Sequence, residues 1–301
     1  MNEPGETIRR GGTSNFRMRM TTAFGTVTAR PDEARLAEIS RAAACSPYYF
    51  HRRFTQLFGL PVGRYAQLLR LERASYQLAF RWSVSVTEVA MDAGYSAPDA
   101  FAKAFSKRFG QSPSGFRRQP EWQRWQVALA PLDAVRSKHM PQRFSIDEVS
   151  VVTREPVAVA VLSHVGDPAR LGDSIRRFIA WRRAAGLSPQ VSDTYNVFHC
   201  DPRSTPPERY RLDLCAATTN RIDDDPQGVT AGLIPGGRCA RLRVVGGGHD
   251  LEAPADFLLR TWLPHRDEVA AGPLFCQRVR FFPDVAEHEA ITDLYLPLAE
   301  R

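Results

Sequence analysis

The feature that most restricts the fold of this chain is a segment that occurs twice, about fifty residues apart. Residues 38–46 (EISRAAACS) match residues 88–96 (EVAMDAGYS) in their apolar pattern, position for position. In both copies the apolar residues follow helical spacing up to a break before the serine, and a second helical pattern begins after it. Each second pattern ends in Phe-Gly, at residues 58–59 and 109–110. This arrangement predicts two helix-turn-helix units.

The second helix of the first copy places apolar and polar side chains on opposite sides. Phe50, Phe54 and Phe58 recur at a helical spacing that suits a core. Ser46 can cap this helix, and Pro47 suits its first turn. The side chains on the far side are Tyr48, His51, Arg52 and either Tyr49 or Arg53. A helix that enters the major groove of DNA needs donors of this kind near its N-terminus, and cations for the phosphates.

The charge of the chain is unevenly distributed. The net charge is +7 over 301 residues. Residues 31–125 hold 14 Lys or Arg against 8 Asp or Glu, whereas residues 126–301 hold 21 against 23. The positive excess therefore lies in and before the duplicated segment, where the neutralisation of phosphates would use it. This balance favours double-stranded DNA as the partner of the first half.

On these residues, the region 33–119 resembles the DNA-binding domain of the AraC/XylS transcription regulators. The resemblance is carried by residues 43–54 (AACSPYYFHRRF) and, in the second copy, by Gly94-Tyr95-Ser96, Phe101 and residues 105–117 (FSKRFGQSPSGFR). It implies that the first recognition helix reads bases through Tyr48, His51 and Arg52. It likewise implies that the second recognition helix reads bases through Pro98, Asp99 and Lys103.

The second recognition helix departs from the family pattern, which commonly has amide side chains where Pro98 and Asp99 stand. Proline has no donor, and aspartate repels phosphates and accepts only from cytosine amino groups. We therefore expect this helix to contribute mainly phosphate contacts. The predicted DNA-binding residues are Tyr48, His51, Arg52, Arg53, Pro98, Asp99, Lys103, Lys107 and Arg108.

The sequence divides into four segments. Residues 1–30 lack a periodic apolar face, so we expect a disordered or loosely ordered arm. Residues 31–125 form the DNA-binding domain, in which an amphipathic helix over 65–79 would hold the two recognition helices about one turn of B-DNA apart, roughly 34 Å. Residues 126–143 make a partly helical linker, and residues 144–301 make a second domain.

From residue 144 the pattern changes to short apolar strands. We expect strands over 149–154, 157–162, 195–199, 210–217, 238–245, 275–281 and 291–296, and helices over 171–185 and 254–262. This order gives two successive β-α-β-β repeats, which predicts an α+β domain with an antiparallel sheet curved around a pocket. The chain is therefore predicted to be a multidomain protein with an all-α first domain.

Residues 144–301 resemble the GyrI-like effector-binding domain of AraC-type regulators. The motifs are residues 198–202 (FHCDP), 205–213 (TPPERYRLD), 235–238 (PGGR), 262–264 (WLP) and 293–298 (DLYLPL). The resemblance implies a small-molecule effector, amphipathic or cationic in the family, in a groove between the two repeats. A buried glutamate often supplies the countercharge there, and Cys276 stands at its position. A neutral or electrophilic ligand, a countercharge from Asp213 or Glu268, and a degenerate pocket all stay open.

Aromatic side chains in this half suit the wall of an apolar cavity, which favours a lipophilic ligand. The predicted ligand-binding residues are Trp181, Tyr195, Phe198, Trp262, Cys276 and Tyr295. No metal, cofactor or catalytic residue is predicted, because the histidines lack ligand spacing and the Gly-Gly-Gly at 246–248 lacks the Lys-Ser/Thr of a P-loop. Five scattered cysteines are expected to be reduced thiols.

We expect a transcription regulator rather than an enzyme. We expect it in the cytoplasm, because no apolar run reaches the roughly 18 residues of a membrane span. Its expected partners are double-stranded DNA, a small-molecule effector that is lipophilic, and RNA polymerase, with no membrane partner. Ligand capture would alter DNA binding or polymerase contact. Two alternatives stay open: a GyrI-like hydrolase of reactive small molecules, and a ligand-independent activator whose second half binds protein partners.

Overall fold

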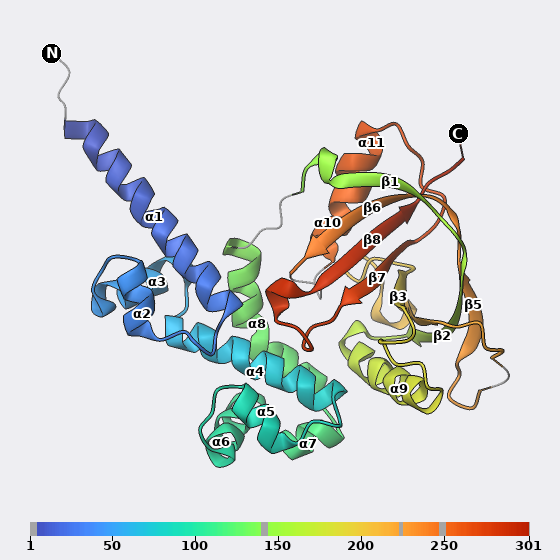
Figure 1. Ribbon diagram of the computed structural model, residues 1–301, viewed down its shortest axis with the longest axis horizontal. Helices are drawn as coiled ribbons and strands as arrows, with labels where there is room; N and C mark the ends of the chain where they lie inside the picture. Colours follow the sequence, from blue (N-terminus) through green and yellow to red (C-terminus); the bar gives the residue numbers. More distant parts are fainter. Residues whose placement is uncertain (1–4, 140–143, 223–224, 247–250, 301) are drawn as a thin grey trace. The chain divides into compact units, whose positions relative to one another are not determined.

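Figure 1 shows the computed structural model of the chain, which describes residues 5–139, 144–222, 225–246 and 251–300, with side chains from residue 16 onward. The chain divides into two compact units, Met1–Pro141 and Gln142–Arg301. The described part of the first unit is all α-helical, and the second combines helices with a single sheet, so both predicted fold classes are confirmed. Among the described residues, none of the helices has the length and apolar character needed to cross a bilayer.

The first unit is arranged along the long helix α4. Its helices are α1 (Gly5–Ala29), α2 (Leu36–Ala42), α3 (Pro47–Phe58), α4 (Val62–Phe80), α5 (Val86–Asp92), α6 (Pro98–Phe109), α7 (Pro113–Arg118) and α8 (Trp122–His139). The pairs α2 with α3 and α5 with α6 are the two predicted helix-turn-helix units. Helix α4 corresponds to the amphipathic helix expected over 65–79, and it lies between the two units in the chain.

The two turns use the same backbone conformation with different residues. Ala44 in the first turn and Gly94 in the second both have positive φ, 51° and 73°. Ser46 caps α3, since its hydroxyl accepts a hydrogen bond from the Tyr49 amide at 3.3 Å. Helix α6 begins one residue later relative to the repeat, and its N-cap Ala97 has no side-chain oxygen to accept such a bond. Helix α3 is therefore better capped at its N-terminus than helix α6.

Helix α1 corrects the expectation of a disordered or loosely ordered arm over residues 1–30. Met20, Phe24 and Val27 are buried and lie four and three residues apart, so they form one face of a helix. The Phe24 ring stacks on Phe58 at 4.4 Å and on Tyr65 at 4.9 Å between centroids. The sequence concealed this face because its few apolar residues stand among Gly, Thr and Arg. Residues 1–4 of the expected arm lie outside the described residues.

Helix α8 extends through most of the segment expected as a linker over residues 126–143. Its Leu129, Leu132 and Val135 are buried. Arg136 donates two hydrogen bonds to the buried carboxylate of Glu72 in α4, at 2.8 and 2.7 Å. This helix is therefore an integral part of the first unit. Residues 140–143, the rest of the expected linker, lie outside the described residues.

The second unit contains one antiparallel sheet of eight strands in the order β1-β6-β8-β7-β3-β4-β2-β5. The strands are β1 (Val149–Arg154), β2 (Val157–Val165), β3 (Thr194–Phe198), β4 (Arg211–Ala217), β5 (Thr230–Ile234), β6 (Gly237–Val245), β7 (Leu274–Arg280) and β8 (Ile291–Pro297). The repeats β2-α9-β3-β4 and β6-α10-β7-β8 occupy equivalent places, with α9 at Leu171–Ala184 and α10 at Glu252–Phe257. The predicted β-α-β-β repeats are thus confirmed, and β5 is an additional strand.

Two short connections force the sheet to curl. Strands β1 and β2 lie near opposite ends of the strand order, yet only Glu155 and Pro156 join them. Likewise only Pro235 and Gly236 join β5 to β6. Because such a connection spans at most about 10 Å, the two edges must approach each other, and Figure 1 shows β1 curving into β2. A Cβ on Gly236 would stand 2.7 Å from the Pro156 nitrogen, so the two connections are packed together.

The two faces of the sheet carry different cores. Helix α9 covers one half of the convex face through Phe178 and Trp181, and the helical segment that begins with α10 covers the other half through Leu258 and Trp262. This segment continues as a π-helical turn at Leu258–Trp262 and as α11 (Leu263–His265). The concave face has its own buried cluster of Val159, Tyr195, Cys215, Ile234, Cys239, Phe275 and Tyr295.

Candidate DNA-binding and ligand-binding sites

Helix α3 presents a polar face because its other face is fixed by three aromatic side chains. Phe50, Phe54 and Phe58 are buried at intervals of four residues. Tyr48 is 77% exposed, and His51 and Arg52 on the same side are also exposed. With Thr55 and Gln56 these three residues line a surface hollow. The structure therefore brings the predicted base-reading residues of the first unit together on the outside of the helix.

Arg53 lies apart from that face. Its Nη1 donates to Gln56 Oε1 at 2.7 Å, and its guanidinium lies 5.7 Å from the centre of the Phe16 ring in α1. The residue is half-buried, and its Nε is buried without a hydrogen-bond partner among the described residues. Among the predicted DNA-binding residues of α3, Arg53 is thus the one held toward α1.

Helix α6 repeats the aromatic scaffold and carries a different outer face. Phe101, Phe105 and Phe109 are buried, whereas Asp99, Lys103 and Lys107 are exposed and Pro98 is half-buried at the first position of the helix. Arg108 donates to the main-chain carbonyl of Ala128 in α8. Burial lowers the pKa of Arg108, and the charge of Arg64 adds to this. Arg108 therefore stabilises the contact between α6 and α8, which leaves Lys103 and Lys107 as the exposed cations.

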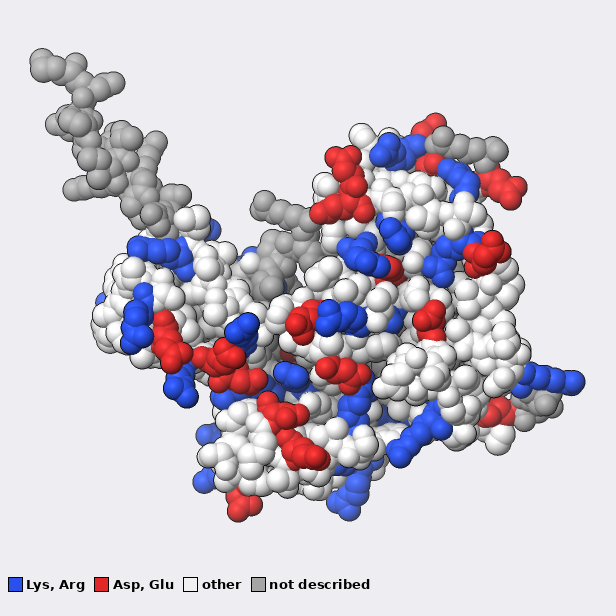
Figure 2. Space-filling view, viewed as in Figure 1, with Lys and Arg blue, Asp and Glu red and all other residues white. Residues whose placement is uncertain are grey.

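Charged side chains are intermixed on the face of the molecule drawn in Figure 2. Lys and Arg alternate there with Asp and Glu, and no region of a single sign forms. The positive excess of residues 31–125 is therefore not gathered on this face. Any attraction of DNA to a single basic surface must come from another side of the first unit.

The structure does not bring the six predicted ligand-binding residues to one place. Tyr195 and Tyr295 lie on the concave face of the sheet, whereas Trp181, Trp262 and Cys276 are buried under the helices on the convex face. Phe198 is half-buried on the convex face, between the cluster under α9 and the cluster under α10. The reason is the alternation of side chains along a strand, which sends Tyr195 and Phe198 in β3 to opposite faces.

The concave face contains an arginine that the sequence did not single out. The Arg154 guanidinium carbon lies 4.1 Å from the centre of the Tyr295 ring, 5.5 Å from Phe275 and 5.7 Å from Tyr195. Phe275 and Tyr295 are stacked at 5.0 Å. These distances are those of cation–π contacts. A sequence signal existed, because Val152 and Arg154 are two residues apart at the end of β1 and therefore point to the same face. Their partners, however, come from distant strands.

Two aspartates on the concave face are fully engaged. Asp213 accepts from Ser163 at 2.6 Å and from Arg211 at 3.0 and 3.2 Å, and it lies 2.6 Å from His199 Nε2. Burial works to raise the pKa of Asp213, but the hydrogen bonds from these three neighbours outweigh it and hold the pKa below its ordinary value. In the second repeat, Arg243 binds Asp293 through two hydrogen bonds of 2.7 Å.

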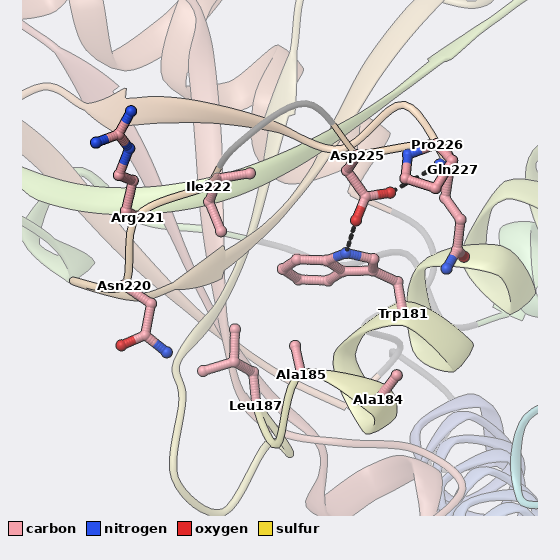
Figure 3. Close-up of a pocket in the computed structure, with 10 residues that line it drawn as sticks. All are labelled: Trp181, Ala184, Ala185, Leu187, Asn220, Arg221, Ile222, Asp225, Pro226 and Gln227. Atoms are coloured by element: carbon pink, nitrogen blue, oxygen red, sulfur yellow. Dashed lines mark hydrogen bonds between the residues drawn. The ribbon is translucent and has the colours of Figure 1, made fainter.

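A hollow of about 470 Å³ is lined by residues from the C-terminal end of α9, by residues 220–222 and by residues 225–227. Figure 3 shows these side chains. Trp181, Ala185, Leu187 and Ile222 point toward the hollow. Trp181 Nε1 donates to Asp225 at 2.7 Å, and the backbone N–H of Gln227 donates to the same carboxylate. A ligand there would therefore meet apolar walls and a carboxylate whose two oxygens already accept hydrogen bonds.

Two buried thiols of the second unit, Cys215 and Cys276, are poorly placed for nucleophilic chemistry. All five cysteines are free. Burial raises the pKa of Cys276, and it raises the pKa of Cys215 to about 12, so neither is a ready nucleophile. The described residues contain no group of three or more His, Cys, Asp or Glu side chains placed to hold a metal ion.

Two family models match the chain. A model described as a helix-turn-helix domain matches residues 39–119, and a model described as a GyrI-like small molecule binding domain matches residues 147–299. Helices α1 and α8 lie outside both matched regions. Each match therefore falls within one of the two structural units.

Named relatives match either a half or about a third of the chain. The protein called Probable transcriptional regulator YgiV, from Escherichia coli K12, is 35% identical over 154 residues, which are 50% of this chain and 96% of that protein. The Right origin-binding protein of the same strain is 28% identical over 87 residues, which are 29% of this chain and 30% of that protein. A solved structure described as the EcmrR-DNA complex in EcmrR-RPo covers 88% of this chain and 99% of that chain, with 13% identity and a TM-score of 0.44.

Proposed function

Because the chain belongs to the GyrI-like small-molecule-binding family and carries an AraC-type helix-turn-helix domain, we propose that it is a transcription regulator controlled by a small molecule. The first unit binds double-stranded DNA, and the second binds the effector. The relative named Probable transcriptional regulator YgiV agrees with this role. A regulator of this kind acts in the cytoplasm, where the chromosome is.

The observation that carries the proposal is the outer face of α3. Tyr48, His51 and Arg52 are exposed on the first two turns of a helix whose opposite side is anchored by buried phenylalanines. The N-terminal turns of a recognition helix are the part that reaches base edges in the major groove. A guanidinium at this place can bind a guanine through two hydrogen bonds, which discriminates it from other bases.

Helix α6 serves mainly to hold the protein on the phosphates. Lys103 and Lys107 supply exposed positive charge on the outer side of this helix, and Asp99 at its first turn would repel a phosphate. Because phosphate contacts carry no sequence information directly, the two recognition helices have different roles. Helix α3 selects the site, and helix α6 adds affinity and fixes the orientation.

The second unit couples a ligand to transcription. An effector can shift the regulator between two states only by as much as it prefers one state over the other. The aromatic cluster of the concave face favours an effector with a lipophilic body. Contact with RNA polymerase is the further step by which DNA binding would change transcription.

The test is a DNA mobility shift with the promoter region of its own gene and with systematically substituted versions of the bound site. Arg52→Ala should cost about 1–3 kcal/mol of binding free energy, and the loss should be confined to one base position. Arg183→Ala is the matched control, because Arg183 is an exposed arginine in α9 of the second unit. Equal affinity of the Arg52→Ala and wild-type proteins for every site would contradict the proposal.

For the alternative, hydrolysis of a reactive small molecule, Ser163 is not placed as an activated nucleophile. A serine nucleophile needs a base that accepts its proton, as histidine does in a catalytic triad. Ser163 instead donates to Asp213, and His199 binds the other oxygen of the same carboxylate. Ser163 and His199 both bind Asp213, and His199 is not placed to accept the proton of Ser163.

A further inference from the structure

The concave face of the sheet has two arginines beside one aromatic ring, and its two aspartates, Asp213 and Asp293, are bound to other arginines. Arg154 and Arg241 are both half-buried. Within the described part of the chain, neither has an ion-pair partner. Half-buried charges without a partner are costly, because burial removes water that would otherwise stabilise them. An anion bound between these two cations would supply the missing opposite charge.

Arg154 has hydrogen-bond donors to spare. Its Nη2 donates to the Tyr195 hydroxyl at a long 3.5 Å, and its Nε is buried with no partner among the described residues. The Tyr195 hydroxyl in turn donates to Asp193 at 3.4 Å. Three aromatic rings lie within 5.7 Å of the guanidinium carbon. A guanidinium supported in this way still offers N–H groups to an oxyanion, which it can bind through two parallel hydrogen bonds.

Arg241 approaches the same ring from the neighbouring strand. It pairs directly with Tyr295 in the antiparallel register of β6 and β8, so both side chains project from the same face. Burial raises the pKa of Tyr295, and the positive charges of Arg154 and Arg241 act in the opposite direction. The Tyr295 hydroxyl therefore lies in a field made by both arginines. Asp293 also faces this ring, but its carboxylate is occupied by Arg243.

The backbone holds Arg154 in place. Arg154 precedes the tight connection of Glu155 and Pro156 between β1 and β2. A Cβ on Gly236 of the other connection would lie 2.9 Å from the Arg154 carbonyl oxygen, which shows how closely the two backbones approach. The main chain at Arg154 cannot move away without separating these connections. The backbone from which the Arg154 side chain projects is therefore held in place.

We propose that the concave face binds a small organic anion whose carboxylate or phosphate group lies between Arg154 and Arg241. This inference rests on the proposed effector-binding function and specifies the charge of the effector. A cationic ligand is disfavoured, because Arg154 already lies 4.1–5.7 Å from the centres of the three rings and would repel a second cation. The apolar side chains Val152, Val161 and Val197 on the same face suit the lipophilic body of such a ligand.

The experiment is isothermal titration of the full-length protein with three aromatic probes of similar size. Benzoate and phenyl phosphate carry the two candidate anionic groups, and benzyltrimethylammonium carries a positive charge. We expect at least one anion to bind and the cation not to bind. Arg154→Met and Arg241→Met should each weaken anion binding about tenfold or more, which is the loss expected for one charge-assisted pair. Arg209→Met, which removes an exposed arginine elsewhere in the unit, should leave binding unchanged.

Three results would overturn the inference. They are binding of the ammonium probe in preference to both anions, no binding of either anion, and anion binding that survives both substitutions. Arg154→Lys keeps the charge without the forked geometry of a guanidinium. It replaces the methionine variant in the titrations if that variant does not fold. Failure of the inference can be told from failure of the proposed function, because a lipophilic cation that binds and alters the mobility shift would retain the regulator and reject only the anion.

Discussion

Helices α3 and α6 are two versions of one recognition helix with different outer faces. Both have 12 residues, begin with proline and end at a glycine of positive φ. Both bury three phenylalanines spaced four residues apart: Phe50, Phe54 and Phe58 in one, and Phe101, Phe105 and Phe109 in the other. Their exposed residues share almost nothing. The comparison shows that the side chains that build a recognition helix are separate from those that read DNA.

The supports around the two helices are also equivalent, although they come from different parts of the chain. Tyr65 and Phe116 occupy corresponding places after α3 and α6. Phe24 of α1 stacks on Tyr65 at 4.9 Å, and Trp122 of α8 contacts Phe116 edge-on at 5.7 Å. Both supporting helices lie outside the matched helix-turn-helix region. Each unit therefore completes its aromatic core with a ring from a flanking helix.

The largest effect should come from breaking both scaffolds in the same way. Phe54→Ala and Phe105→Ala should each lower the free energy of unfolding of the first unit by about 3–5 kcal/mol, because each leaves a cavity in an aromatic core. Urea denaturation followed by helical circular dichroism measures this loss. Val127→Ala, at a position 73% exposed, is the control and should cost about 0.5 kcal/mol or less. A much smaller cost at Phe105 than at Phe54 would mean that the scaffolds are not equivalent.

The next effect should separate the outer faces. Lys103→Ala should weaken binding to all DNA sequences alike and reduce the salt dependence of the binding constant by about one unit of slope. Arg52→Ala should instead cost about 1–3 kcal/mol at a single base pair. Mobility shifts at several salt concentrations measure both. The division of roles fails if Lys103→Ala changes the preferred sequence.

A smaller effect should come from the helix caps. Ser46→Ala removes the hydroxyl that accepts from the Tyr49 amide and should cost about 1 kcal/mol. Ala97→Ser introduces a cap at a residue whose backbone is already extended, φ −145° and ψ 138°, and should gain up to about 1 kcal/mol. Thermal melting measures both changes. Opposite signs are required, so a loss of stability in both variants would show that α6 does not need a cap.

The smallest effect should come from the turns. Ala44 has a φ of 51°, a conformation that costs a residue with a Cβ, so Ala44→Gly should raise the stability by about 0.5 kcal/mol or less. Gly94→Ala introduces the same strain, and its Cβ would stand 3.0 Å from Arg70 Nη1. We expect it to lower the stability by about 1 kcal/mol. Melting temperatures of the two variants should therefore move in opposite directions.

Periodic apolar residues made most of the fold predictable. The repeated phenylalanines placed α3 and α6, and the alternating strands of the second unit were found within a few residues of their ends. Strand β5 was missed because Thr230, Ala231 and Leu233 of this edge strand are exposed and give no alternating signal. Helix α1 was missed because its buried face consists of few residues in a polar background. Short or one-sided patterns are the ones that a sequence hides.

The candidate sites were predictable only where one helix carries them. Tyr48, His51 and Arg52 follow one another on α3, so helical geometry alone unites them. Trp181, Trp262 and Cys276 were grouped with Tyr195 and Tyr295 although the sheet separates them, because register and face depend on how distant strands pair. The place of Arg154 beside Tyr295 depends on the curl of the whole sheet, which no local pattern encodes.

The curl has a consequence for how the second unit can be divided. Strand β1, which precedes the first repeat, pairs with β6 of the second repeat, and β5, which precedes the second repeat, pairs with β2 of the first. The strand that precedes each repeat thus pairs with the other repeat. A protease cut between β4 and β5 would yield two fragments, each of which lacks the strand that pairs with one of its own. The two repeats are therefore expected to fold and unfold together.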